Sequence, residues 1–179
     1  MNNYTTGRIR LPQIAEGRSC GPCTACCTTH AVYEIRKRGG RPCPHVCEKG
    51  CAIYADRPES CRTFSCLWLM GWIIEGDERR RPDRLGLVFG VGPYGKNALI
   101  IQCHEVWTGA ADTGTSGRYY LDKLTKKQAV ALYRTDGSAF MLPTWEPFEY
   151  TREDEIWDTP LWADWLERLK SCGLAAPQA

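Results

Sequence analysis

The amino-acid sequence predicts an α+β protein in which a turn-rich cysteine cluster module packs on a small antiparallel β-hairpin or sheet with flanking helices. Three observations predict this fold class. Nine of the 11 cysteines lie between residues 20 and 66, among glycines and prolines that interrupt regular elements. Two β-rich runs then flank a Gly/Pro turn, and helical patterns follow. We expect residues 1–75 to form the module and residues 76–179 an α+β remainder packed against it, with one continuous domain as the alternative.

Length, composition and charge exclude several classes of protein. A chain of 179 residues with 43% hydrophobic and 25% charged residues is typical of a globular protein, and should bury roughly 70% of its unfolded surface. The longest nearly uncharged apolar run, residues 65–74, is far shorter than the ~20 residues of a membrane span. The net charge of +2 provides no field that would attract nucleic acid or an anionic membrane. No apolar segment follows the first charged residues, so we expect a cytoplasmic protein.

The segments after residue 66 are interpreted from hydrophobic patterns and turn residues. The two β-rich runs flank the Gly/Pro-containing residues 92–97, which predicts a hairpin. A helix is expected after Thr125, a suitable N-cap, because apolar residues between 124 and 133 can share one face. In order, we predict a short buried segment at 67–74, strands at 85–91 and 98–107, a polar loop at 109–117, a helix at 125–133 and a strand at 138–142.

The last third of the chain predicts an amphipathic helix over residues 161–171. Pro160 suits the first helical position, because its fixed φ angle fits a helix and its missing N–H would have no helical partner there. We interpret this element as a packing helix rather than a partner-binding helix. Its apolar face consists of Leu161, Trp162, Trp165, Leu166 and Leu169.

The cysteine-rich segment needs more than a hydrophobic core to hold it together. It offers few large apolar side chains to offset the cost of ordering its backbone. Metal–thiolate bonds or disulfides are the usual solutions in such segments, and the missing secretory pattern favours metal. We therefore predict that residues 1–75 form a metal-binding module that metal holds in its fold.

The spacing of the first cysteines indicates a metal centre. Cys20, Cys23 and Cys26 are each separated by two residues, and a tight turn brings such sulfurs to one side of the chain. Ferredoxin-type sequences present three thiolates to a four-iron cluster with this spacing and take a fourth ligand from elsewhere. Cys27 follows Cys26 directly, so the two side chains point in different directions. The pair indicates two metal centres, or one ligand beside a thiol that does not bind the metal.

Residues 20–66 resemble the YkgJ-type cysteine cluster family, which is regarded as zinc- or iron-chelating. The C-x-x-C-x-x-C-C opening matches Cys20–Cys27, and later family pieces match Cys51–Tyr54, Arg57–Pro58 and Cys61–Cys66. The resemblance covers about a quarter of the chain and implies eight metal ligands: Cys20, Cys23, Cys26, Cys27, Cys43, Cys51, Cys61 and Cys66. It also implies a distant relation to flagellin lysine methylases. No G-x-G-x-x-G loop follows a predicted strand, so the sequence does not support a methyl-donor site.

The sequence leaves the metal open between Zn2+ and an iron–sulfur cluster, because both take four thiolates at similar spacing. The run of three cysteines slightly favours the cluster, whereas the surplus of cysteines fits two zinc ions equally well. Cys47 and His45 lie outside the family pattern, and each is a candidate to replace a ligand or to line the site. The number of centres and the exact ligand set are therefore open.

Other side chains within the module are expected to support the site. Tyr54 and Phe64 are predicted to pack over it and exclude water, because apolar groups commonly close metal–thiolate sites. Arg57 and Arg62 are candidates either to neutralise thiolates or to face solvent.

Residues outside the cluster give weaker indications. His30 and His104 have no partner at metal-ligand spacing, and we expect them to be structural or exposed. Cys103 and Cys172 lack a second cysteine within the span of a chelating turn, so we expect small buried side chains. The charged stretch 78–84 mixes acids with arginines, which is typical of a solvated face rather than a nucleic-acid contact.

Taken as a whole, the sequence favours a metal-binding protein that chelates zinc or an iron–sulfur cluster, with a structural or redox role. The alternative is a cluster-containing enzyme of protein modification, which would need an open coordination position and a nearby pocket. A nucleic-acid-binding zinc module is less favoured, because the net charge is near neutral. No catalytic constellation of the Ser/His/Asp or Cys/His kind is visible, so the question of enzymatic activity is open. The sequence indicates no membrane contact and names no protein partner.

Overall fold

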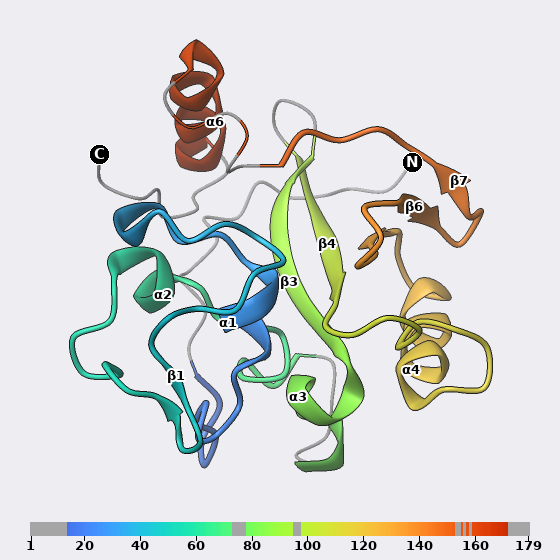
Figure 1. Ribbon diagram of the computed structural model, residues 1–179. Coiled ribbons are helices and arrows are strands. Elements are labelled where there is room, and N and C mark those ends of the chain that lie inside the picture. The colour runs from blue at the N-terminus through green and yellow to red at the C-terminus, as the bar shows by residue number, and fades with distance from the viewer. Residues whose placement is uncertain are drawn as a thin grey trace.

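The protein has an α+β fold, as predicted, with a five-stranded sheet, a two-stranded sheet and short helices (Figure 1). The computed structural model describes residues 14–72, 78–94, 98–152, 155, 157 and 159–171. Parts of the predicted segments 67–74 and 92–97, Cys172, and the side chains of Trp165 and Leu169 lie outside the described residues. No helix in the described part of the chain is both long and apolar enough to cross a membrane.

The cysteine-rich segment contains only short elements, which confirms the prediction from its glycines and prolines. Its two strands pair antiparallel, with Val46 opposite Cys51. The elements are α1 (Ala25–Thr29), the 3-10 turn η1 (Tyr33–Ile35), β1 (Val46–Cys47), β2 (Gly50–Cys51) and α2 (Glu59–Thr63).

The five-stranded sheet begins with the predicted hairpin. β3 and β4 pair antiparallel from Leu87 opposite Glu105 to Tyr94 opposite Ala98. β3 starts two residues later than expected, because residue 85 ends the helix α3 and Gly86, with φ +80°, turns the chain into the strand. The elements are the 3-10 turn η2 (Glu78–Arg80), α3 (Pro82–Leu85), β3 (Leu87–Tyr94), β4 (Ala98–Glu105), β5 (Val130–Tyr133), β6 (Ala139–Leu142) and β7 (Glu146–Pro147).

The sheet is mixed, so the predicted antiparallel arrangement holds for only part of it. The strand order is β3-β4-β5-β6-β7, and β4 and β5 are parallel, with Ile101 beside Val130. Parallel neighbours need a connection that crosses back along the sheet, and the helix α4 (Ser116–Thr125) lies in that connection. β6 pairs antiparallel with both β5 and β7, and it confirms the strand expected at 138–142.

The helix expected at 125–133 is wrong, because α4 ends at Thr125 and β5 follows it. Thr115, rather than Thr125, caps the helix: its Oγ1 accepts a hydrogen bond from the backbone N–H of Arg118 at 3.0 Å. The apolar side chains between 124 and 133 therefore belong to two successive elements, the end of a helix and a buried strand.

The C-terminal helix α6 (Pro160–Ser171) confirms the prediction of a helix near residues 161–171. Trp162 is buried and stacks on Tyr33 of η1, with ring centroids 5.1 Å apart. Leu161 is 58% exposed and does not belong to the packing face. The helix therefore packs beside the cysteine-rich segment (Figure 1).

The hydrophobic core lies between the sheet, α4 and a buried turn at residues 67–70. All buried members of this core cluster come from residues 67–142, and Leu67, Leu121 and Leu132 are completely buried. Cys20 and Cys66 pack against the cluster from the cysteine-rich side. The buried segment expected at 67–74 is thus confirmed for its first four residues, whereas Trp72 is 68% exposed.

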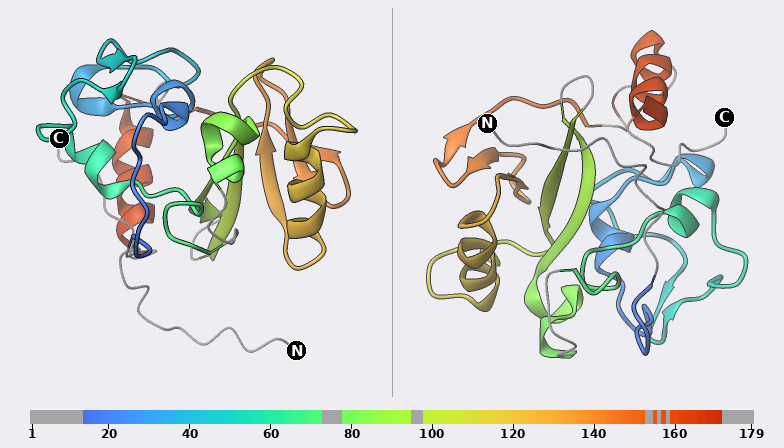
Figure 2. Two further views of the ribbon diagram at one scale, coloured as in Figure 1. Left: turned by 90° about the horizontal axis from the view of Figure 1, so that it is seen from below. Right: turned by 180° about the vertical axis from the view of Figure 1, so that it is seen from behind.

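The cysteine-rich segment and α4 lie on opposite sides of the β3–β4 hairpin, as Figures 1 and 2 show. A row of aromatic rings joins the segment to the sheet. The His30 ring lies 4.1 Å from Phe64 and 4.8 Å from His104, and His104 stacks on Tyr133 at 4.7 Å, all between ring centroids. The two histidines are therefore structural residues of this contact.

His104→Phe should make the protein less sensitive to acid. Burial lowers the pKa of His104 to about 4, against 6.5 in an exposed chain. The unfolded state therefore takes up a proton first, and stability that is present above pH 6.5 is lost as the pH falls toward 4, by up to about 3 kcal/mol. Urea denaturation of both proteins at pH 7.5, 6 and 5 measures this. Parallel loss of stability in the two proteins would contradict the expectation.

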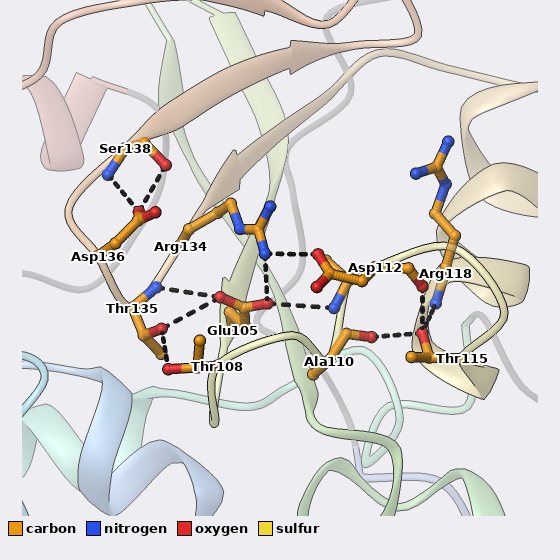
Figure 3. A network of polar contacts seen from close by, with 11 residues as sticks. Glu105, Thr108, Ala110, Asp112, Thr115, Arg118, Arg134, Thr135, Asp136 and Ser138 are labelled. Atoms are coloured by element: carbon orange, nitrogen blue, oxygen red, sulfur yellow. Dashed lines mark hydrogen bonds and ion pairs between the residues drawn. The ribbon is translucent and has the colours of Figure 1, made fainter.

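A buried carboxylate fastens the loop after β4 to the β5–β6 turn (Figure 3). Glu105 is 5% exposed, and its oxygens accept hydrogen bonds from the N–H of Ala111 at 3.1 Å and from the N–H and Oγ1 of Thr135 at 3.1 and 3.3 Å. Arg134 Nη2 lies 3.5 Å from Glu105 Oε1 and 2.6 Å from Asp112 Oδ1. The loop expected at 109–117 ends at Thr115, because α4 begins at Ser116, and this network anchors the loop.

Candidate metal centre

The cysteines differ in their surroundings. The ten cysteines in the described part of the chain are free thiols. The eight predicted ligands are all partly buried, whereas Cys47 on β1 is exposed. Cys103 on β4 is completely buried in the core, as expected for a small apolar side chain.

Four of the predicted ligands line one cavity. Cys20, Cys23, Cys26 and Cys66 surround a space of about 20 Å³. The cavity therefore brings the spaced run together with one distant cysteine. The rest of the lining is Trp68, Leu69, Pro82 and Val88.

A tight turn directs the spaced cysteines toward this cavity. The N–H of Cys23 donates a hydrogen bond to the carbonyl oxygen of Cys20 at 2.9 Å, and Gly21 inside the turn has φ +50°. Helix α1 begins two residues after Cys23 and carries Cys26. The spaced run thus places three cysteines in the lining of one cavity.

Backbone N–H groups donate to the sulfurs of the cavity. The N–H of Leu69 lies 3.4 Å from Cys66 Sγ, and Cys23 accepts hydrogen bonds from the N–H groups of Ala25 and Asp83. Burial opposes ionisation: it raises the pKa of Cys23 to about 12 and raises the pKa of Cys66. A bound cation would reverse this balance, because coordination deprotonates a thiol.

Asp83 and Arg81 form a charged pair beside the cavity. The Cys23 thiol hydrogen-bonds to the Asp83 carboxylate, and Arg81 Nε and Nη2 donate to its two oxygens at 2.6 and 2.9 Å. Burial alone would raise the pKa of Asp83, but the hydrogen bonds from Arg81 hold it below its usual value. Arg81 is 8% exposed, so the stretch 78–84 is not solely a solvated face.

The other four predicted ligands come from α1, the loop before β1, β2 and α2. The N–H of Cys43 donates to the carbonyl oxygen of Cys27 at 3.0 Å. Val46 donates to the carbonyl oxygen of Cys43 at 3.2 Å and pairs with Cys51. Burial, followed by nearby charges that include Cys27, Cys43 and Cys51, raises the pKa of Cys61 to about 11. These four thiols therefore form a second neighbourhood.

Cys26 and Cys27 connect the two neighbourhoods. A hydrogen bond from the Cys26 thiol to the Cys27 sulfur raises the pKa of Cys26 and lowers that of Cys27. Cys26 lines the cavity, whereas Cys27 is not among the described residues of its lining. The two vicinal sulfurs thus stay in hydrogen-bond contact, although only Cys26 belongs to the described lining of the cavity.

Lys37 is a buried positive charge that sequence analysis missed. Lys37 is 5% exposed. Its ammonium group donates hydrogen bonds to the carbonyl oxygen of Thr28, at 3.0 Å, and to that of His30. Burial lowers the pKa of Lys37, and the charges of Cys43 and Cys27 oppose that effect most strongly. The ammonium is thus positioned to offset thiolate charge in the second neighbourhood.

Side chains that were expected to support the site make other contacts. Arg57 stacks on Tyr54, 4.1 Å from the ring centroid, and Arg62 pairs with Glu59 at 3.0 Å. Tyr54 is 43% exposed. The apolar cover of the cavity comes from residues 68–69, 82 and 88 instead.

Within the described ranges, no group of three or more cysteine, histidine, aspartate or glutamate side chains has the spacing of an assembled metal site. Four of the cysteines line one cavity, but the described cysteines do not form a closed coordination shell. Their chemistry nevertheless fits a metal, because thiolates are the preferred ligands of structural zinc and of iron–sulfur clusters.

Comparison of the chain with protein-family models, with curated proteins and with solved structures finds no match. The resemblance of residues 20–66 to the YkgJ-type cysteine cluster family is therefore an interpretation of the motif. What these residues do must be inferred from their geometry and their chemistry.

Proposed function

We propose that this protein binds metal through cysteine thiolates. The observation that carries the proposal is the single cavity lined by Cys20, Cys23, Cys26 and Cys66. Three of these sulfurs come from one spaced run and the fourth from beyond α2. Four thiolates are one of the standard ligand sets of a structural zinc ion. Membership of the YkgJ-type family, proposed from the motif, agrees with this function.

The four cysteines of the cavity suit a single zinc ion, because zinc takes four thiolates in a tetrahedron. A [4Fe–4S] cluster takes the same number of thiolates, and the spacing of the first three cysteines suggests it. We take zinc as the first choice because a four-thiolate site is a standard structural zinc site, and metal analysis decides between the two.

A four-cysteine site of this kind has a structural role. Four protein ligands leave no open coordination position for a substrate, and zinc has no redox chemistry. Cys66 directly precedes the buried turn at 67–70, and Cys20 packs against the same core. Coordination would therefore tie the spaced cysteine run to the hydrophobic core. This arrangement favours a structural metal over the enzymatic alternative.

Metal analysis of protein purified under reducing conditions tests the proposal. We expect zinc in the wild type, and less in Cys66→Ser because that variant loses one of four ligands. Cys103→Ser is the matched control, since it removes a buried thiol that lies outside the cavity. A metal-free wild type, or equal zinc in Cys66→Ser and the wild type, would contradict the proposal. Iron and sulfide with a broad visible absorption band would identify a cluster instead.

Gly50→Ala should lower the metal affinity by at least about tenfold. Gly50 has φ +115°, and a Cβ atom there would lie 2.5 Å from the carbonyl oxygen of Gly21, in the turn between Cys20 and Cys23. The added methyl group must displace this turn. Gly40→Ala is the matched control, because Gly40 also has a positive φ, +69°, but no atom lies within 4 Å of its added Cβ. Competition with a chelator measures affinity, and equal losses in both variants would disprove the role of the contact.

A further inference from the structure

We propose that a groove between the C-terminal end of α4 and the buried turn that begins at Leu67 binds a small organic anion with a flat apolar ring, such as an aromatic carboxylate. The groove has a volume of about 180 Å³. Its described lining shares no residue with that of the four-cysteine cavity, so this inference goes beyond the proposed metal binding and does not depend on it.

The most buried part of the groove is apolar and belongs to the hydrophobic core. Leu67 is completely buried and Leu124 of α4 is 8% exposed, and both line the groove. Ile101 of β4 also lines it and packs against the same core cluster. The core therefore fixes the position of these three side chains, and a ligand that covers them is favoured because it removes apolar surface from water.

A hydrogen-bonded turn holds Trp72 at the rim of the groove. The N–H of Gly71 donates to the carbonyl oxygen of Trp68 at 3.1 Å, and Gly71 has φ +76°. The N–H of Trp72 donates to the carbonyl oxygen of Leu67, also at 3.1 Å. This is the hydrogen-bond pattern of a Schellman motif, in which apolar side chains at these two positions commonly contact each other. Here both line the groove and Trp72 is 68% exposed, so much of the indole surface is available to a ligand.

Tyr120 of α4 provides a second aromatic side chain in the lining. Its ring meets Tyr119 edge-on, with centroids 5.2 Å apart, and the Arg80 guanidinium carbon lies 4.8 Å from its centroid. Tyr120 also packs against the core cluster, so its ring is held from several sides. Two aromatic side chains in one small space favour a planar ring, which can make stacked or edge-to-face contacts with them.

Two lysines make the rim of the groove positive. Lys123 lies near the end of α4, and Lys127 follows the helix, where its N–H donates to the carbonyl oxygen of Leu124 at 2.9 Å. Both lysines are exposed, and neither has an ion-pair partner among the described residues. The described lining contains no acidic side chain. Two positive charges outweigh the partial charge of about −0.5 at the end of a helix, so the rim attracts an anion.

The volume and the charge of the groove together define the class of ligand. A protein cavity of about 150 Å³ holds one benzene ring, so the groove accommodates one six-membered ring with a short acidic arm. Lysine ammonium groups bind carboxylate and phosphate groups as compact point charges. The ligand is therefore a ring that covers the apolar part of the groove and carries an anionic group at the rim.

An NMR titration of the isotope-labelled full chain, as purified, tests the site with phenylpropionate. A ligand with about 11 non-hydrogen atoms should bind with a dissociation constant of a few millimolar or tighter. Phenylpropionamide lacks the charge and acetate lacks the ring, so each should bind at least about tenfold more weakly. Phenyl phosphate is the second anion: binding of either anion in preference to the amide supports the site, and the tighter of the two identifies the anionic group.

Equal binding of phenylpropionate and its amide, or no binding of phenylpropionate at about 10 mM, would overturn the proposal. This comparison needs no variant, and it does not involve the cysteines, so its failure would leave the proposed metal binding intact.

Substitutions at the rim locate the bound anion. Lys123→Gln combined with Lys127→Gln should weaken the binding of phenylpropionate by about tenfold, because both positive charges are lost. Lys126→Gln is the matched control, since it removes an exposed lysine of the same segment that is not part of the described lining. Trp72→Ala should also weaken binding by at least about tenfold, because it removes the exposed indole. Unchanged affinity in the double variant, or equal losses in it and in Lys126→Gln, would overturn the assignment of the groove.

Discussion

Removing the metal with a chelator under reducing conditions should unfold residues 20–66 and leave the five-stranded sheet folded. Structural zinc sites contribute on the order of 10–16 kcal/mol to folding at neutral pH. The described part of this segment buries only two hydrophobic residues other than cysteine, Ala25 and Val32, whereas the core cluster is built from residues 67–142. Limited proteolysis with mapping of the fragments should therefore show new cleavage confined to the cysteine-rich segment.

The control for this experiment is the same chelator already saturated with zinc, which should leave the segment protected. An oxidant-treated sample covers the case of an iron–sulfur cluster, which can resist a chelator for kinetic reasons. Equal protease resistance of residues 20–66 in the metal-loaded and metal-depleted protein would show that metal does not hold this segment.

Glu105→Ala should lower the free energy of unfolding by about 2–4 kcal/mol. The substitution leaves the buried N–H group of Ala111 and the part-buried N–H group of Thr135 without their acceptor, and an unsatisfied buried group costs about 1–3 kcal/mol. It also removes one of the two carboxylates that contact Arg134. Because the net stability of a domain is about 5–15 kcal/mol, this loss is large. Denaturant unfolding followed by tryptophan fluorescence measures it.

Asp112→Ala is the matched control for Glu105→Ala. Asp112 binds the same guanidinium group at 2.6 Å, but its side chain is 57% exposed. An exposed ion pair contributes about 0–1 kcal/mol, so this variant should unfold close to the wild-type midpoint. Similar losses in the two variants would show that burial of the Glu105 carboxylate does not decide its contribution.

Local sequence patterns were sufficient to predict the elements whose formation depends on residues close together in the chain. The β3–β4 hairpin follows from two β-rich runs around a turn, and α6 follows from a proline and an apolar period. The helix expected at 125–133 is wrong because its apolar residues belong to the end of α4 and to the strand β5, and the local pattern does not show where one element ends. The parallel pairing of β4 with β5 depends on a crossover through α4, which no local pattern records.

The sequence also could not predict which cysteines lie together in the fold. The motif identified eight candidate ligands, and the structure brings Cys66 to the same cavity as the spaced run. Spacing cannot show which distant cysteine completes which group, because that depends on how α2 packs. Lys37 was missed because it stands between two arginines, which is the pattern of an exposed basic run. Asp83 was missed because its approach to Cys23 depends on the placement of α3.

X-ray absorption at the zinc edge of the protein as purified tests the central claim most directly, because it identifies the atoms bound to the metal. Thiolate coordination by this module predicts a shell of four sulfur atoms at about 2.3 Å, with no nitrogen or oxygen ligands. A first shell made of nitrogen and oxygen atoms at about 2.0–2.1 Å would contradict metal binding by the cysteines.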